Sequence, residues 1–129
     1  MTYLCDSDWV IDFLKGRTEA TALFGQLYDG GMAMSIMTFA EVYEGIYYGR
    51  DQMKHDAGFR ALCRAMRVLG VNRSIARRYA RIRGDLRARG LLIPQPDTLI
   101  AATALHYDLI LVTRNLRDFQ RIPNLKTYQ

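Results

Sequence analysis

Residues Leu109 to Val112 are four apolar residues in a row, and this run constrains the fold more than any other part of the chain. A strand that is apolar on both faces is typical of a parallel sheet covered by helices on each side. Two other short runs, Thr2–Cys5 and Met32–Ser35, alternate with segments of helical periodicity. The alternation predicts an α/β fold, a three-layer α/β/α sandwich around a mainly parallel sheet.

Helices are expected between these strands. The best-defined one has apolar residues at steps of four, three and four from Ile75 to Leu86. A further short strand is expected near Val71. The chain has 129 residues and no repeat or linker, which predicts a single domain over 1–129. The first helix is expected to begin at Ser7 or Asp8 and to end at Gly16. The later helices are expected at Glu19–Tyr28, Thr38–Tyr48, Asp51–Leu69, Ser74–Arg89 and Asp97–His106.

The N-terminus meets Asp6, Asp8 and Asp12 too early for a signal peptide. No apolar stretch reaches the ~20 residues that would span a bilayer. Cys5 and Cys63 lie among apolar residues, so we expect small buried thiols in a reducing compartment. The sequence therefore predicts a cytoplasmic protein without a membrane partner.

The net charge is +5, and all but three of the 18 basic residues are arginines. Arginine binds phosphate through a planar, bidentate fork, so a polyanion such as nucleic acid is a plausible partner. Charge alone is equally compatible with a role in solubility. The candidate phosphate contacts, each of which has a solvated surface residue as its alternative, are Arg73, Arg77, Arg81, Arg87 and Arg114.

Four acidic residues, Asp6, Glu41, Asp97 and Asp118, are candidates for a catalytic site. Asp6 directly follows the first strand, and Asp118 lies in the loop after the last one. Glu41 is in the helix after the second strand, and Asp97 opens a helix. Ligands of such sheets bind beyond the carboxyl ends of the strands, so all four can face one site.

Clustered carboxylates repel one another unless a cation offsets their charge. Oxygen ligands suit Mg²⁺ or Mn²⁺, which can activate water and stabilise a phosphodiester during in-line attack. Each acid also has a structural alternative, since Asp6, Asp8 or Asp97 could cap a helix, Glu41 could be solvated, and Asp118 could cap a turn before Phe119. Caps alone do not explain why acids follow two separate strands.

The segments around these acids resemble, in order, the four motifs of PIN-domain nucleases. Residues 3–8 are similar to their Leu-Asp-Thr/Ser-Asn/Asp opening, and residues 35–45 to their Ser-x-x-Thr-x-x-Glu-x-x-x-Gly motif. Residues 97–104 and 111–119 resemble the third and fourth motifs. The short length and the Arg-rich helix before the third motif are most similar to the VapC toxins of toxin–antitoxin pairs.

This resemblance implies a Mg²⁺-dependent endoribonuclease, in which Mn²⁺ can substitute. It implies that Asp6 and Asp97 bind the metal and that Glu41 and Asp118 complete the acidic cluster. Supporting hydrogen bonds are expected from Ser7 and Thr113, and either Asn115 or Asp118 is nearer the metal. Asp8, where the family often has Asn, either adds charge or caps the helix. The family further implies a homodimer and an antitoxin whose C-terminal segment blocks the active site.

Three other functions compete with this one. Residues 6–10 match the Asp-x-Asp-x-Val loop of haloacid-dehalogenase phosphatases, with Asp6 as nucleophile, but the lysine and late acidic pair of that class are missing. A receiver domain needs a phosphorylatable Asp after a central strand, and Asp51 and Asp56 follow no apolar run. A non-catalytic nucleic-acid-binding module remains open, although all four acids are present.

Overall fold

The structure is a computed structural model that describes all residues from 1 to 129. Four parallel strands form one sheet in the order β3-β2-β1-β4. Tyr3 of β1 is in register with Met32 of β2 on one side and Ile110 of β4 on the other. The strands are β1 (Tyr3–Cys5), β2 (Met32–Ser35), β3 (Arg67–Leu69) and β4 (Ile110–Val112).

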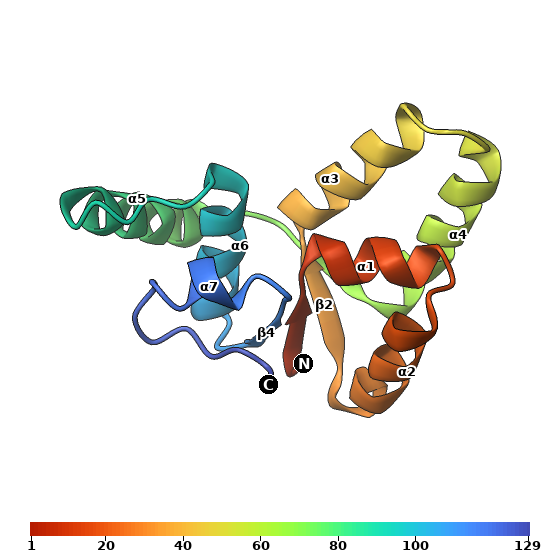
Figure 1. Cartoon of the computed structure of the whole chain (residues 1–129), viewed down its shortest axis with the longest axis horizontal. Coiled ribbons are helices and arrows are strands. Elements are labelled where there is room, and N and C mark those ends of the chain that lie inside the picture. Colours follow the sequence, from red (N-terminus) through yellow and green to blue (C-terminus); the bar gives the residue numbers. More distant parts are fainter.

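Helices cover both faces of the sheet, which confirms the predicted α/β/α sandwich (Figure 1). No helix of the chain combines the length and apolarity that a membrane crossing requires. A short 3-10 turn, η1 (Tyr28–Gly30), leads into β2. One layer contains α1 (Ser7–Leu14), α2 (Thr18–Leu27), α3 (Ile36–Tyr47) and α4 (Gln52–Ala65), and the other contains α5 (Arg73–Ala88), α6 (Gln95–His106) and α7 (Leu116–Phe119).

Side chains of the central strands alternate between two apolar cores, one on each face of the sheet. Leu4 and Leu111 pack in the core under α5 and α6, whereas Cys5, Met34 and Val112 pack in the core under α1 to α4. Strand residues point alternately to opposite faces, and here both faces are buried. This explains why the β4 run is apolar without interruption.

The helix predicted for Asp51–Leu69 is too long, and the strand predicted near Val71 comes earlier. Helix α4 ends at Ala65, and Met66 has extended φ and ψ of −121° and 133°. Residues 67–69 then form β3, which pairs in parallel with β2. Pairing with β3 satisfies the outer backbone N–H and C=O groups of β2, which would otherwise be an open edge of the sheet. It also buries Leu69, while Val71 stays exposed.

Asp118 lies in a short helix, α7, and not in a loop as predicted. Phe119 is fully buried in the core beside α6, and its backbone N–H donates to the carbonyl of Asn115. Burial of the Phe119 ring thus accompanies a four-residue helix, which is too short to be recognised from a periodic pattern of apolar residues. Both cysteines are free thiols, but only Cys5 is fully buried, while Cys63 is partly exposed.

Candidate active site

Asp6 is the most enclosed of the four acids, with 5% of its surface exposed. It follows β1 directly and caps α1, because its Oδ1 accepts a 2.7 Å hydrogen bond from the backbone N–H of Ser7. Its Oδ2 accepts a 2.7 Å hydrogen bond from the hydroxyl of Thr113, which follows β4. Both carboxylate oxygens are therefore fixed, one by each of two neighbouring strand ends.

Glu41 is held by Ser7, the residue after Asp6. The Ser7 hydroxyl donates a 2.6 Å hydrogen bond to Oε1 of Glu41, and Thr38 Oγ1 lies 3.3 Å from the same hydroxyl oxygen. Helix α3 can bring Glu41 here because Ser35 caps its start, accepting from two backbone N–H groups at 3.1 Å. With this cap, α3 starts at Ile36, two residues earlier than predicted.

Asn115 stands between the other two acids. Its Nδ2 donates a 3.0 Å hydrogen bond to Oδ2 of Asp118 and lies 3.5 Å from Oδ2 of Asp97. Asp97 is in the first turn of α6, where no side chain caps the helix, so the predicted alternative of a capping Asp97 is wrong. The sequence left open whether Asn115 or Asp118 is nearer the metal, and the structure places the Asn115 amide between Asp118 and Asp97.

The acids share one electrostatic environment. Burial first, and then the charges of Asp6, Glu41, Asp118 and Asp8, raise the pKa of Asp97 from 3.8 to about 6. Burial likewise raises the pKa of Asp6 and of Glu41, although hydrogen bonds from Thr113 and Ser7 oppose it. Asp8 is exposed and makes no cap, so of its two predicted roles it has the electrostatic one.

No lysine or arginine forms an ion pair with Asp6, Glu41 or Asp97. Their only hydrogen-bond partners are neutral donors, so their negative charge is uncompensated by the chain. No three His, Cys, Asp or Glu side chains lie close enough to chelate one ion together. The set suits a hydrated, oxygen-preferring cation such as Mg²⁺, which binds through one or two carboxylates and keeps its other waters.

The predicted arginines divide into two groups. Arg73, Arg77, Arg81 and Arg87 are exposed on α5 and form no ion pair. Arg114 instead is engaged with α1 through Asp12 and Trp9, two residues that the sequence did not single out. No local pattern joins residues 102 positions apart, so only the fold reveals that contact.

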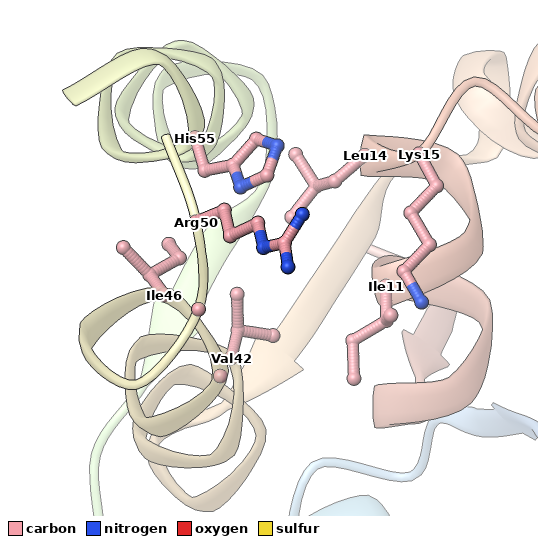
Figure 2. Close-up of a pocket in the computed structure, with 9 residues that line it drawn as sticks. Ile11, Leu14, Lys15, Val42, Ile46, Arg50 and His55 are labelled. Atoms are coloured by element: carbon pink, nitrogen blue, oxygen red, sulfur yellow. The ribbon is translucent and has the colours of Figure 1, made fainter. Parts of the chain in front are cut away.

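A separate cavity of about 390 Å³ lies between α1, α3 and α4 (Figure 2). Its walls are apolar, formed by Ile11 and Leu14 on one side and Val42 and Ile46 on the other. Three basic or titratable side chains, Lys15, Arg50 and His55, surround this apolar space. The cavity contains none of the four acids, but Val42 directly follows Glu41 in the chain.

The parallel sheet with acids gathered beyond its carboxyl ends defines a PIN-like α/β/α domain. The family model described as "PIN domain" matches residues 3–125. "Ribonuclease VapC2" of Haemophilus influenzae is 32% identical over 128 residues, 98% of this chain and 96% of that protein. The chain therefore belongs to the PIN-domain family, in which its relatives are VapC proteins. This assignment leaves the haloacid-dehalogenase and receiver alternatives without support.

Solved structures agree with the assignment. VapBC2 from Rickettsia felis, solved bound to a DNA fragment from its promoter, has the same fold, with a TM-score of 0.91, 23% identity and coverage of 99% of this chain and 98% of that one. A toxin–antitoxin complex from Klebsiella pneumoniae is 28% identical, with a TM-score of 0.76 and coverage of 99% of both chains.

Proposed function

We propose that this protein is a Mg²⁺-dependent endoribonuclease and the toxin of a toxin–antitoxin pair. The observation that carries the proposal is the convergence of Asp6, Glu41 and Asp97 without a basic partner. An acidic cluster that stays uncompensated needs a cation to be stable in its charged form. The similarity to proteins named ribonucleases supports RNA as the substrate.

Asp6 and Asp97 would hold the metal, with Glu41 and Asp118 completing the negative site. A divalent ion bound there supplies an activated water and stabilises charge on the phosphodiester. The residues of the chain orient this chemistry: Thr113 fixes Oδ2 of Asp6, and Ser7 fixes Oε1 of Glu41. Mn²⁺ should replace Mg²⁺, because both prefer oxygen ligands.

Helix α5 is the proposed binding surface for RNA phosphates. It carries six arginines and one aspartate, so its net charge equals the +5 of the whole chain. The one aspartate, Asp85, is already paired with Arg89 at 2.9 Å. Arg83 donates to the carbonyl of Ile93, which ties α5 to the segment just before α6 and Asp97. Phosphates held along α5 would therefore lie beside the acidic cluster.

RNA cleavage by the purified protein tests this function. We expect cleavage with Mg²⁺ or Mn²⁺ and none with EDTA. Asp6→Asn and Asp97→Asn should abolish it, whereas Asp85→Asn, a change of the same chemistry on the exposed face of α5, should not. A wild-type protein that binds RNA but never cuts it would support the non-catalytic module instead. Cleavage that persists in Asp97→Asn would overturn the metal mechanism.

The proposed protein partner is an antitoxin whose segment covers the active site. The cavity in Figure 2 offers apolar walls and a basic rim, so it suits an apolar segment that carries acidic residues. It adjoins the acidic cluster through α3, where Glu41 and Val42 are consecutive. Inhibition of cleavage by the product of a small adjacent reading frame is the corresponding test.

A homodimer is the proposed assembly of the toxin itself. A second groove of about 280 Å³ lies where α3, α5 and α6 meet, and Met37, Tyr79 and Leu99 line it. Ile36 and Val71 leave 37% and 42% of their surfaces exposed nearby in the chain. Exposed apolar surface of this kind marks interfaces. Light scattering should give twice the 14.8 kDa chain mass.

A further inference from the structure

Arg114 ties the loop after β4 to the helix that follows β1. Its Nη1 donates a 2.6 Å hydrogen bond to Oδ2 of Asp12, and Nη2 lies 3.9 Å from Oε2 of Glu19. The guanidinium carbon lies 3.8 Å from the centre of the Trp9 ring, so the cation is stacked as well as paired. Asp12 and Trp9 belong to α1 and Glu19 to α2, so one side chain spans from the loop to both helices.

The residues on either side of Arg114 hold the acids. Thr113 donates to Asp6 at 2.7 Å, and its Oγ1 accepts a 3.0 Å hydrogen bond from the backbone N–H of Asn115. Asn115 in turn reaches Asp118 and Asp97. Helices α1 and α7 lie on opposite faces of the sheet (Figure 1), so this three-residue loop joins acids that come from both layers.

The guanidinium of Arg114 already makes its contacts within the protein. Its side chain is 36% exposed, and two carboxylates and an aromatic ring take up its charge and one of its flat faces. A phosphate contact at this position would have to compete with a 2.6 Å ion pair. Arg73 and Arg77, by contrast, have no such partner, so the two kinds of arginine should respond differently to substitution.

We propose that Arg114 is a positioning residue that sets the placement of Asp6 relative to Asp97, acting through Thr113 and Asn115. Its effect on cleavage rests on the proposed function, whereas its effect on the loop does not. Displacing groups of an active site by about 1 Å can cost about a hundredfold in rate. A lysine at this position keeps the charge but loses the planar fork and the stacking on Trp9.

Variants of the pair distinguish positioning from phosphate binding. Arg114→Ala, Arg114→Lys and Asp12→Ala should each lower kcat by about tenfold to a hundredfold with KM nearly unchanged. The double variant Asp12→Ala/Arg114→Ala should fall no further than Arg114→Ala alone, because that single variant already removes the contact with Asp12. The matched control is Arg117→Ala, since Arg117 is an exposed arginine three positions away without an ion pair, and kcat should stay the same. An unchanged kcat with a raised KM in Arg114→Ala would overturn the proposal in favour of a phosphate contact.

Hydrogen exchange tests the loop without metal, RNA or activity. The backbone N–H of Asn115 should exchange faster in Arg114→Ala and in Asp12→Ala than in the wild type or in Arg117→Ala, while the core amides of β1 stay protected. Exchange at Asn115 that is unchanged in Arg114→Ala would also overturn the proposal. If the wild type cleaves no RNA but the Asn115 amide still exchanges faster in Arg114→Ala and Asp12→Ala, the proposed function fails and the positioning role stands.

Discussion

The hydroxyl of Thr113 donates a 2.7 Å hydrogen bond to Oδ2 of Asp6, although the two residues are 107 positions apart. It joins the ends of β4 and β1, which are neighbouring parallel strands. The acid is buried, and the bond lowers its pKa against the larger, opposing effect of burial. Thr113 therefore helps to keep Asp6 ionised, the form that can bind a metal.

Thr113→Val should raise the pKa of Asp6 and slow cleavage at neutral pH. The change keeps the shape but removes the donor, leaving a buried carboxylate oxygen without its partner, at a cost of about 1–3 kcal/mol in unfolding free energy. The acid limb of the pH–rate profile should move to higher pH. Thr113→Ser should retain both rate and profile, and Thr21→Val, which removes an exposed hydroxyl from α2, provides the control. An unshifted acid limb in Thr113→Val would contradict this role.

The metal-free protein should lose stability as the pH rises through the titration range of Asp97. The pKa of Asp97 is raised from 3.8 to about 6, so between these values the folded state binds its proton more tightly than the unfolded chain does. The stabilisation is complete below about pH 4 and is gone above about pH 6. Thermal unfolding in EDTA should show this decline, and Asp97→Asn should flatten it and raise Tm near pH 7.

Added Mg²⁺ should reverse that loss, because a cation favours the charged carboxylates. We expect Tm to rise with Mg²⁺ near pH 7 and to respond less near pH 5, where Asp97 is mostly protonated. Asp85→Asn should behave as the wild type in both experiments. A Tm that responds equally to Mg²⁺ in the wild type and in Asp97→Asn would show that the ion binds elsewhere.

Much of the architecture could be predicted because local patterns carry it. The apolar run at β4 indicated a sheet buried on both faces, and the period of Ile75 to Leu86 indicated α5 almost to the residue. A short strand was expected near Val71, but its position at residues 67–69 could not be predicted because it depends on pairing with β2. Helix α7 likewise depends on where Phe119 is buried.

The acidic cluster was predictable because strand ends of a parallel sheet meet at one edge. The hydrogen bonds and the ion pair within the site were not predictable, because they join distant segments of the chain. Ser7 holds Glu41, Asn115 lies between Asp97 and Asp118, and Arg114 pairs with Asp12. Arginine chemistry made Arg114 a candidate phosphate contact, and nothing near it in the sequence showed that it pairs with Asp12.

Removing arginines from α5 should weaken RNA binding by an amount that depends on salt. Each phosphate contact to single-stranded RNA contributes about 0.7 to the slope of log K against log salt, so Arg73→Ala/Arg77→Ala/Arg81→Ala should reduce that slope by about 2. The control Arg60→Ala/Arg64→Ala removes two exposed arginines from α4 and should leave it unchanged. Binding is best measured with Asp6→Asn as background, so that RNA stays intact. Equal losses per arginine removed in both sets would mean that α5 contributes only general charge.

Reversing the charges around the cavity in Figure 2 should release the toxin from its antitoxin without harming cleavage. Lys15 and Arg50 are exposed side chains that surround apolar walls, so Lys15→Glu/Arg50→Glu would repel an acidic segment while leaving Val42 and Ile46 in place. RNA cleavage by the variant alone should match the wild type, because neither residue contacts the acids. The amount of antitoxin needed for half-inhibition should rise at least tenfold. Lys54→Glu on α4 makes the same kind of change outside the cavity and should leave inhibition intact. Inhibition of Lys15→Glu/Arg50→Glu at the wild-type antitoxin concentration would place the antitoxin on another surface.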